Sequence, residues 1–340
     1  MRHRLIALFG ALGLVATVLG ASAAVGTAAS ERAADSKLSL VAYSTPREAY
    51  AKLIPMFQKT AAGNDVDFSQ SYGSSGEQTR AVKAGLQADI VALSLAPDVD
   101  ELVAANLVDA KWKAQAYKGM VTNSVVVFVV RDGNPKKIKS WNDLLRPDVE
   151  VVTPNPFTSG GARWNVMAAY GAWRKAGKTD KQAQGNLLRL FRNVVVQDTS
   201  ARASLSTFNS GKGDVLLAYE NEALFARTQG LDLQFVIPKA TILIENPVAV
   251  TKSSPDRAAA NAFLRFLRTQ AAQQVFADNG YRPVVKSVEN RNRAKFPVRP
   301  GLFTIDQLGL GGWTNVQKRF FAPKGSVMAR IQRAVGGSTG

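Results

Sequence analysis

The chain contains no cysteine, and its single histidine is His3. Without cysteine it can form no disulfide and has no thiol nucleophile. Because His3 lies in the segment expected to be cleaved off (below), the remaining chain also lacks the base of a Ser-His catalytic pair. The usual zinc, copper and haem sites also need cysteine or histidine ligands. We therefore expect no metal, no cofactor and no chemistry of these kinds. An exported domain with a large core folds without disulfides, so secretion remains compatible with this composition.

The first residues have the pattern of an export signal. A basic segment at Arg2 to Arg4 precedes an apolar run from Leu5 to Leu19, and the small residues Ala21 to Ala23 follow. This order predicts a signal peptide over residues 1–23, with Ala28-Ala29 as a later cleavage site. An uncleaved membrane anchor is the alternative, because the apolar stretch continues to Val25. No cysteine follows it, so we expect a periplasmic protein that is not a lipoprotein.

The chain is strongly basic, with a formal net charge of +17. From Arg282 to the end there are eleven lysines and arginines against only Glu289 and Asp306. A nucleic-acid binder is one hypothesis for such a charge, but the chain has no recognised nucleic-acid module and no basic motif interleaved with aromatics. We therefore expect no nucleic-acid partner. A solvated basic face, or mild steering of an anionic ligand, is the preferred interpretation.

Strand-like and helix-like patterns alternate along the remaining residues, which predicts an α/β fold with mostly parallel sheets. The strands are expected at Leu38–Ala42, Val66–Gln70, Asp89–Leu93, Ser124–Val130, Glu150–Thr153, Val194–Val196, Asp214–Ala218, Leu233–Ile237 and Ile242–Val250. The helices are expected at Arg47–Phe57, from Glu77 onward, near Val99–Ala105, and at Ala162–Ala176, Lys181–Phe191, Glu220–Arg227, Pro255–Asp278, Asn315–Phe321 and Val327–Ala334.

Two of these strands, near Val125 and near Val248, connect two α/β units. We therefore expect two lobes with a ligand in the cleft between them, an arrangement known for small-ligand capture. The predicted boundaries place residues 37–124 and 246–335 in lobe I and residues 125–245 in lobe II.

The most informative segment runs from Thr153 to Trp164, with the sequence Thr-Pro-Asn-Pro-Phe-Thr-Ser-Gly-Gly-Ala-Arg-Trp. It follows an apolar strand and starts a long helix. Such a start leaves several backbone N–H groups without partners at the positive end of the helix dipole, which makes an anion site. The segment lacks the Gly-Lys-Ser/Thr of a phosphate loop, so a nucleotide fits poorly. A small oxyanion held by neutral donors fits better.

Four further segments follow the ends of expected strands and carry small or hydroxyl-bearing residues: Tyr43–Tyr50, Ser71–Gln78, Asp198–Arg202 and Leu217–Glu222. A helix is expected to start at the first, the second and the last of them. In open α/β sheets, ligands bind beyond the carboxyl ends of the strands. The sequence therefore predicts that these segments surround one site.

At these positions the chain resembles the periplasmic sulfate-binding proteins of ABC importers, from about Leu38 to Phe321. The matching strings are Ser71-Tyr-Gly-Ser-Ser-Gly76, the spacing from Gly133-Asn-Pro135 to Trp141-Asn-Asp-Leu144, Thr153-Pro-Asn-Pro156, Ser159-Gly-Gly-Ala-Arg-Trp164, Gly213-Asp-Val215, Glu220-Asn-Glu-Ala223 and Gly311-Gly-Trp313. The resemblance implies a monomeric, non-catalytic protein of the two-lobe periplasmic-binding-protein type II fold. Such a protein delivers sulfate or thiosulfate to an ABC transporter permease in the inner membrane.

The resemblance also implies how the anion is held. Carried over position by position, the donors are the backbone N–H groups of Ser44, Ser75, Gly160, Gly161 and Ala201, the hydroxyl of Ser159 and the side chain of Tyr219. The family pattern commonly has Asp in place of Ser44 and Trp in place of Tyr219. A phenol still donates a hydrogen bond, but it reaches differently from an indole.

Charged residues near the site are expected to support it without touching the anion. This set contains Arg47, Arg163, Arg202 and Glu220. Because a buried arginine usually pairs with a carboxylate, Arg163 and Arg202 are expected to bind Glu48, Asp198 or Glu220. Trp164 and Trp173 are expected in the core.

A site made only of neutral donors favours sulfate, which carries no proton at neutral pH. Phosphate carries an O–H that would find no acceptor, and an unpaired buried polar group costs about 1–3 kcal/mol. Molybdate is the other proton-free tetrahedral alternative, and phosphate remains a weaker one. A serine-dependent hydrolase that uses Ser75 or Ser159 is a hypothesis from another class, but neither serine has the Ser-x-x-Lys spacing.

Overall fold

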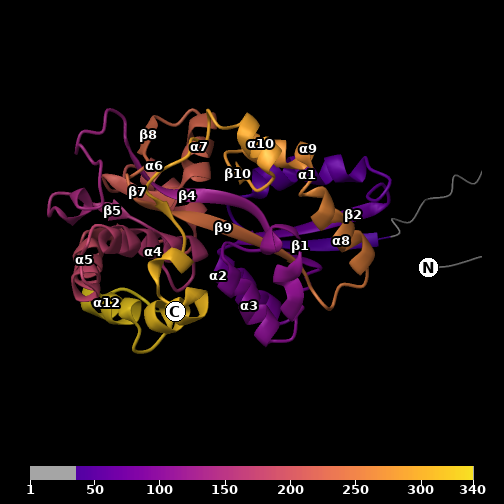
Figure 1. Cartoon of the computed structure of the whole chain (residues 1–340), viewed down its shortest axis with the longest axis horizontal. Coiled ribbons are helices and arrows are strands. Elements are labelled where there is room, and N and C mark those ends of the chain that lie inside the picture. The colour runs from indigo at the N-terminus through magenta and orange to yellow at the C-terminus, as the bar shows by residue number, and fades with distance from the viewer. Residues whose placement is uncertain (1–35, 340) are drawn as a thin grey trace, which may run out of the picture. The chain divides into compact units, whose positions relative to one another are not determined.

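The computed structural model of the chain describes residues 36–339, and its strands form one mixed sheet with the order β2-β1-β3-β9-β4-β7-β5-β6 (Figure 1). Three short strands pair off this path, β8 and β10 with β4, and β11 with β9. The strands are β1 (Ser36–Tyr43), β2 (Val66–Gly73), β3 (Ile90–Ala92), β4 (Met120–Arg131), β5 (Val151–Val152), β6 (Val194–Val196), β7 (Val215–Tyr219), β8 (Leu233–Val236), β9 (Thr241–Val250), β10 (Arg282–Pro283) and β11 (Leu302–Phe303).

The sheet consists of two parallel parts joined by two long antiparallel strands. In the first lobe, β1 pairs in parallel with β2 and β3, and in the second lobe β5 pairs in parallel with β6 and β7. The strands β4 and β9 pair with each other in the middle, where Val125 lies opposite Leu243. Beyond this point β9 continues to β3 and β4 continues to β7. The predicted α/β two-lobe architecture with two crossing strands is confirmed.

Twelve α-helices are described within residues 36–339, and they cover the two parts of the sheet. They are α1 (Arg47–Gln58), α2 (Ser75–Lys83), α3 (Ala96–Ala104), α4 (Gly160–Lys175), α5 (Asp180–Arg192), α6 (Ala201–Asn209), α7 (Glu220–Thr228), α8 (Arg257–Phe266), α9 (Gln270–Asp278), α10 (Lys286–Arg291), α11 (Gly312–Val316) and α12 (Val327–Val335). Shorter helical turns lie at η1 (Ala110–Ala114), η2 (Ala116–Gly119), η3 (Asp143–Leu145) and η4 (Asp306–Leu308), with a π-helical turn η5 (Gln317–Phe321).

Two helix predictions need correction. The helix expected from Glu77 begins at Ser75, which brings its first amides to the end of β2. The single helix expected over residues 255–278 is two helices, because the chain leaves the helix after Phe266 and the Thr269 hydroxyl caps a new one by accepting a hydrogen bond from the Ala272 amide. A side-chain cap of this kind stabilises a new helix start.

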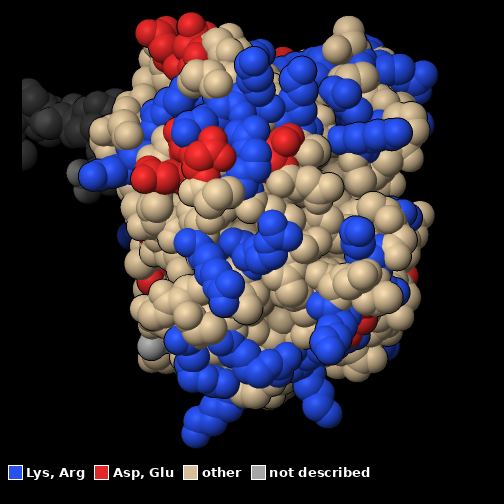
Figure 2. Space-filling model, turned by 90° about the vertical axis from the view of Figure 1, so that its left-hand side faces the viewer, with Lys and Arg blue, Asp and Glu red and all other residues tan. Residues whose placement is uncertain are grey.

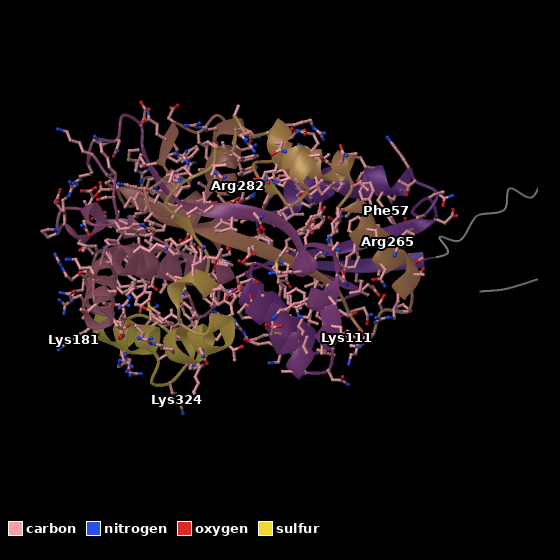
Figure 3. All side chains as sticks on the ribbon, in the orientation of Figure 1. Phe57, Lys111, Lys181, Arg265, Arg282 and Lys324 are labelled. Atoms are coloured by element: carbon pink, nitrogen blue, oxygen red, sulfur yellow. The ribbon has the colours of Figure 1, made fainter. Side chains whose placement is uncertain are left out.

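Aromatic and aliphatic side chains fill the space between the sheet and the helices (Figure 3). In the first lobe the Phe57 ring packs edge-on against Phe263, with 5.1 Å between the ring centroids. In the second lobe Trp164 and Trp173 are buried, as expected. Helix α4 carries both tryptophans and is buried over most of its length, because it lies between the sheet and the C-terminal segment. The start of α4 is therefore held firmly in place.

The C-terminal helix α12 packs against α5 of the second lobe. The predicted lobe boundaries assign α12 to lobe I, and those boundaries remain a prediction. The predicted signal peptide lies outside the described residues. Within residues 36–339 no helix has the length and apolar character needed to span a bilayer.

Candidate functional site

A small cavity lies where the two lobes meet, and it is far smaller than the pockets that hold drug-sized ligands. Its lining contains no charged side chain and consists of Tyr43, Ser44, Thr45, Ser74, Ser75, Ser94, Ser159, Gly161, Ala201 and Tyr219. The polar groups that face it are therefore neutral hydroxyls and backbone amides.

Helix starts surround this cavity because strands end there and helices begin within a residue or two. Ser75 is the first residue of α2, Gly160 the first of α4 and Ala201 the first of α6. The first amides of a helix have no partner within that helix. The Ser159 and Ser200 hydroxyls cap α4 and α6 by accepting from amides one turn further on. The earliest amides of these helices therefore remain as donors at the cavity.

Six of the seven predicted donor residues line the cavity: Ser44, Ser75, Ser159, Gly161, Ala201 and Tyr219. Gly160, the seventh, starts α4 beside them and packs against Ser94 and Leu95 of the first lobe. A Cβ atom at Gly160 would collide with both side chains. Only glycine allows the start of α4 to lie this close to these two side chains.

The hydroxyl of Tyr219 lies 2.6 Å from Oγ of Ser94, so these side chains join the two lobes at the cavity. Burial raises the pKa of Tyr219 well above its ordinary value. The phenol therefore keeps its proton as a hydrogen-bond donor. Ser159 Oγ accepts a hydrogen bond of 3.4 Å from the Ala162 amide, which leaves its own proton to donate elsewhere.

Four cavity residues were not among the predicted donors: Tyr43, Thr45, Ser74 and Ser94. Of these, only Ser94 lies outside the segments expected around the site. Ser74 directly precedes α2, and its buried Oγ has no hydrogen-bond partner among the described residues. Ser94 follows β3, and its carbonyl accepts hydrogen bonds from Trp164 at 2.9 Å and Asn246 at 3.0 Å. Its position two residues beyond the end of β3 is the same signal that identified the other strand ends.

Arg163 does not line the cavity. Its guanidinium lies 3.1 Å from Oδ1 of Asp98 and donates to the Pro156 carbonyl at 2.9 Å. Arg163 thus pairs with a buried carboxylate, as expected, but its partner is Asp98 and not one of the suggested Glu48, Asp198 and Glu220. Burial raises the pKa of Asp98, although the charge of Arg163 and the hydrogen bond from Ser75 oppose that shift. The Ser75 hydroxyl donates to this carboxylate at 2.5 Å, so the ion pair also fixes the start of α2.

Arg202 joins the lobes at the cavity edge, and its predicted pairing with Glu48 is confirmed at 2.7 Å. It also binds the buried Glu222 at 2.9 Å. Burial raises the pKa of Glu222, which Arg202 opposes. Burial also acts to raise the pKa of the less buried Glu48, but the hydrogen bond and charge of Arg202 lower it overall. Because the Arg202 guanidinium binds two carboxylates, its positive charge is already neutralised.

The other two charged residues expected near the site lie further away. Glu220 pairs with Arg282 at 2.7 Å. Arg47 is exposed on α1, where its guanidinium lies 4.8 Å from the centre of the Tyr72 ring. Neither residue lines the cavity. All charges near the site are thus paired with other protein groups or kept outside it.

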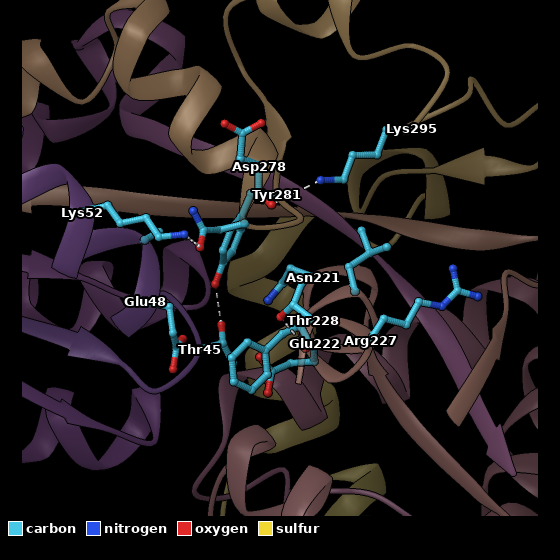
Figure 4. Close-up of a pocket in the computed structure, with 14 residues that line it drawn as sticks. Thr45, Glu48, Lys52, Asn221, Glu222, Arg227, Thr228, Asp278, Tyr281 and Lys295 are labelled. Carbon is cyan, nitrogen blue, oxygen red and sulfur yellow. Dashed lines mark hydrogen bonds between the residues drawn. The ribbon is translucent and has the colours of Figure 1, made fainter. Parts of the chain in front are cut away.

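A larger cavity is lined by residues of α1, of α7 and of the end of α9 (Figure 4). Its wall contains carboxylates as well as cations, and two of the cations already have partners, since Lys52 donates to Asn279 at 3.0 Å and Lys295 to the Ala277 carbonyl at 2.6 Å. The smaller cavity contains no carboxylate and is therefore the better candidate for an anion. Within residues 36–339 no group of acidic side chains has an arrangement suited to a metal ion.

A cavity of neutral donors between two lobes is an arrangement suited to binding a small solute. The family model of the bacterial extracellular solute-binding proteins matches residues 38–282. The chain belongs to this family, whose members bind solutes and do not catalyse reactions. The expectation of a non-catalytic binding protein is thereby confirmed.

Relatives that are named for the anion they bind support the resemblance found in the sequence. A sulfate-binding protein of Synechococcus elongatus is 42% identical over 310 residues, which cover 88% of this chain and 88% of the relative. A thiosulfate-binding protein of Pseudomonas aeruginosa is 35% identical over 322 residues, which cover 91% and 96%. The solved structure of the sulfate-binding protein SubI from Mycobacterium tuberculosis has a TM-score of 0.81 at 41% identity and covers 84% of this chain and 100% of that chain. The resemblance to the sulfate-binding proteins is confirmed.

Proposed function

We propose that this protein binds sulfate in the small interlobe cavity and delivers it to the permease of an ABC importer. The observation that carries the proposal is the lining of the cavity, which offers hydroxyls and helix-start amides and no charged side chain. The donors are Ser44, Ser75, Gly160, Gly161 and Ala201 through their amides, and Ser159 and Tyr219 through their hydroxyls. Ser74 adds one hydroxyl from the first lobe, and the Ser94 hydroxyl donates to Tyr219 Oη, which leaves the Tyr219 proton for the anion.

Helix dipoles supply the attraction that a charged side chain would otherwise supply. Each helix start carries roughly half a positive charge. The starts of α2, α4 and α6 meet at the cavity, and together they offset much of the charge of a dianion. Arg163 and Arg202 add little net charge because carboxylates neutralise both. The geometry therefore holds the anion by oriented dipoles without a countercharge in contact.

The same lining selects against phosphate, whose O–H needs an acceptor. No carboxylate lines the cavity to accept it, and the lining hydroxyls are needed as donors to the anion. Thiosulfate is the second candidate solute, because a relative at 35% identity carries that name. It is proton-free as well, so the cavity chemistry accepts both anions and only size separates them.

We also infer where the protein acts. The export signal over residues 1–23 would be cleaved and release the protein into the periplasm as a monomer, without a lipid anchor. The permease of the importer in the inner membrane is then its partner. The relatives named for sulfate and thiosulfate binding support this placement.

Calorimetric titration tests the proposed solute. We expect one sulfate per monomer and a preference over phosphate at neutral pH of roughly 5- to 150-fold, because one unsatisfied O–H costs about 1–3 kcal/mol. The affinity should persist at about 0.5 M chloride, since a buried site is screened far less than a surface patch. Heat with phosphate and none with sulfate would overturn the proposal.

Replacing Tyr219 by phenylalanine should weaken sulfate binding about tenfold or more. The variant removes one donor to a charged ligand, which contributes about 1.5–3 kcal/mol, and leaves Ser94 without its partner at 2.6 Å. The control is Tyr72→Phe, since the Tyr72 hydroxyl binds only the exposed Gln70 side chain among the described residues. Titration calorimetry measures both variants, and equal affinities would remove Tyr219 from the site.

A further inference from the structure

The second lobe carries a basic face formed by the end of α4, by α5, by η5 and by α12. Residues 174–192 and 317–335 contain eleven lysines and arginines, all of them exposed. The same segments contain a single acidic residue, Asp180, which pairs with Arg319 at 2.5 Å. The basic excess over these segments is therefore ten charges, and it is concentrated on one part of the molecule.

These segments are separate in sequence but adjacent in space. Helix α12 packs along α5, and Arg330 of α12 donates to Gln184 of α5 at 3.4 Å. Figure 2 shows Lys and Arg side chains gathered on the lower part of this face, where Figure 1 places α5 and α12. A hollow on the face is lined by Lys318, Arg319 and Arg330. None of these residues lines the solute cavity.

We propose that this basic face docks the protein on an anionic phospholipid surface. Docking sites for proteins usually have an apolar or aromatic centre. The large hydrophobic residues that are exposed within residues 36–339 are Leu86, Tyr117, Val195 and Val298, and none belongs to the basic face. An anionic bilayer needs no such centre, since its mobile headgroups adjust to scattered cations. Each lysine or arginine near such a surface strengthens binding roughly fivefold.

Docking on the membrane surface would shorten the time in which the protein finds a membrane-embedded partner. A monomer held weakly along the membrane surface remains near any membrane-embedded partner, and it leaves the surface again because the attraction is screened by salt within about 10 Å at 0.1 M. This inference does not depend on which solute the cavity binds.

Co-sedimentation with vesicles tests the proposal. We expect the protein to sediment with vesicles of phosphatidylglycerol and phosphatidylcholine, but not with phosphatidylcholine alone, and to be released at about 0.5 M salt. The variant Lys181→Gln/Lys324→Gln/Arg333→Gln should lose about a hundredfold in partitioning, from roughly fivefold per cation. Its affinity for sulfate should equal that of the wild type, which separates this test from that of the proposed function.

The control is Lys59→Gln/Lys111→Gln/Arg265→Gln, which removes the same charge from exposed positions of the first lobe. Figure 3 places Lys111 and Arg265 far from Lys181 and Lys324. This control should partition like the wild type. Equal losses in both variants would show that net charge acts without a defined face. Absence of binding to anionic vesicles would overturn the proposal, and binding to polyglutamate alone would assign the face to an acidic polypeptide instead.

Discussion

Replacing Gly161 by valine is expected to abolish detectable sulfate binding while the fold is retained. A Cβ atom at this position would lie 3.3 Å from Ser159 Oγ, 3.6 Å from the Ala201 Cβ and 3.6 Å from Tyr219 Cε1. These are ordinary to slightly tight contacts, so the backbone need not move. All three neighbours line the cavity, so the added carbons of valine occupy the space of the anion.

The size of this effect follows from the donors that the anion would lose. A hydrogen bond to a charged group contributes about 1.5–3 kcal/mol, so the loss of two exceeds roughly a hundredfold in the dissociation constant. Valine has a better helix propensity than glycine, so the start of α4 should not be weakened. Titration calorimetry measures the binding, and circular dichroism with thermal unfolding measures the fold.

The matched control is Gly185→Val on α5, where an added Cβ would meet no atom within 4 Å. It makes the same chemical change on an exposed helix surface, and sulfate affinity should stay at the wild-type level. Gly161→Val with an affinity within threefold of wild type would show that the anion lies elsewhere. Loss of binding in both variants would point to a general effect on the protein rather than on the cavity.

The segments at the ends of the strands could be predicted from the sequence, because each is marked by a pattern of neighbouring residues. An apolar strand followed by small residues and a helix pattern identifies a helix start, and Ser75, Ser159 and Ala201 all occupy such starts. The topology of parallel strands then brings those starts to the same edge of the sheet. Local pattern and topology therefore predicted which segments surround the cavity. The individual donors came from the resemblance to the sulfate-binding proteins, and six of those seven residues line the cavity.

The side-chain contacts between the two lobes could not be predicted, because no local sequence pattern indicates them. Asp98 lies 65 residues from Arg163, and Ser94 lies 125 residues from Tyr219, so each pair forms only when the lobes come together. The choice of Asp98 over Glu48 as the partner of Arg163 depends on how α3 meets α4. The contact between α3 and α4 cannot be predicted from hydrophobic periodicity or residue spacing, because it depends on how the whole sheet packs.

Replacing Arg163 by methionine is expected to destabilise the protein by about 3–5 kcal/mol at pH 8, because it leaves the buried carboxylate of Asp98 without its partner. The side chains of Asp98 and Arg163 are only 1% and 9% exposed, so solvent cannot compensate the charge. Methionine keeps much of the packing volume of the arginine stem. Urea unfolding measures the effect.

The stability lost in the Arg163→Met variant should become smaller as the pH falls. Burial already raises the folded-state pKa of Asp98 in the wild type, and removing the opposing charge of Arg163 raises it further. A carboxyl whose pKa is raised on folding contributes stability that is present below its unfolded pKa and is lost as the pH rises through the folded value. The Arg163→Met protein should therefore approach the wild type near pH 5 and differ most at pH 8.

The double variant Asp98→Asn/Arg163→Met separates charge from packing. Asparagine has nearly the same shape as aspartate but carries no charge, so the double variant should be more stable than Arg163→Met at pH 8 and should show no pH dependence from this site. If Arg163→Met lost the same stability at pH 5 and pH 8, the buried charge would not be the cause. The hydrogen bonds from Arg163 to the Pro156 carbonyl and its contact with the Phe321 ring would then account for the loss.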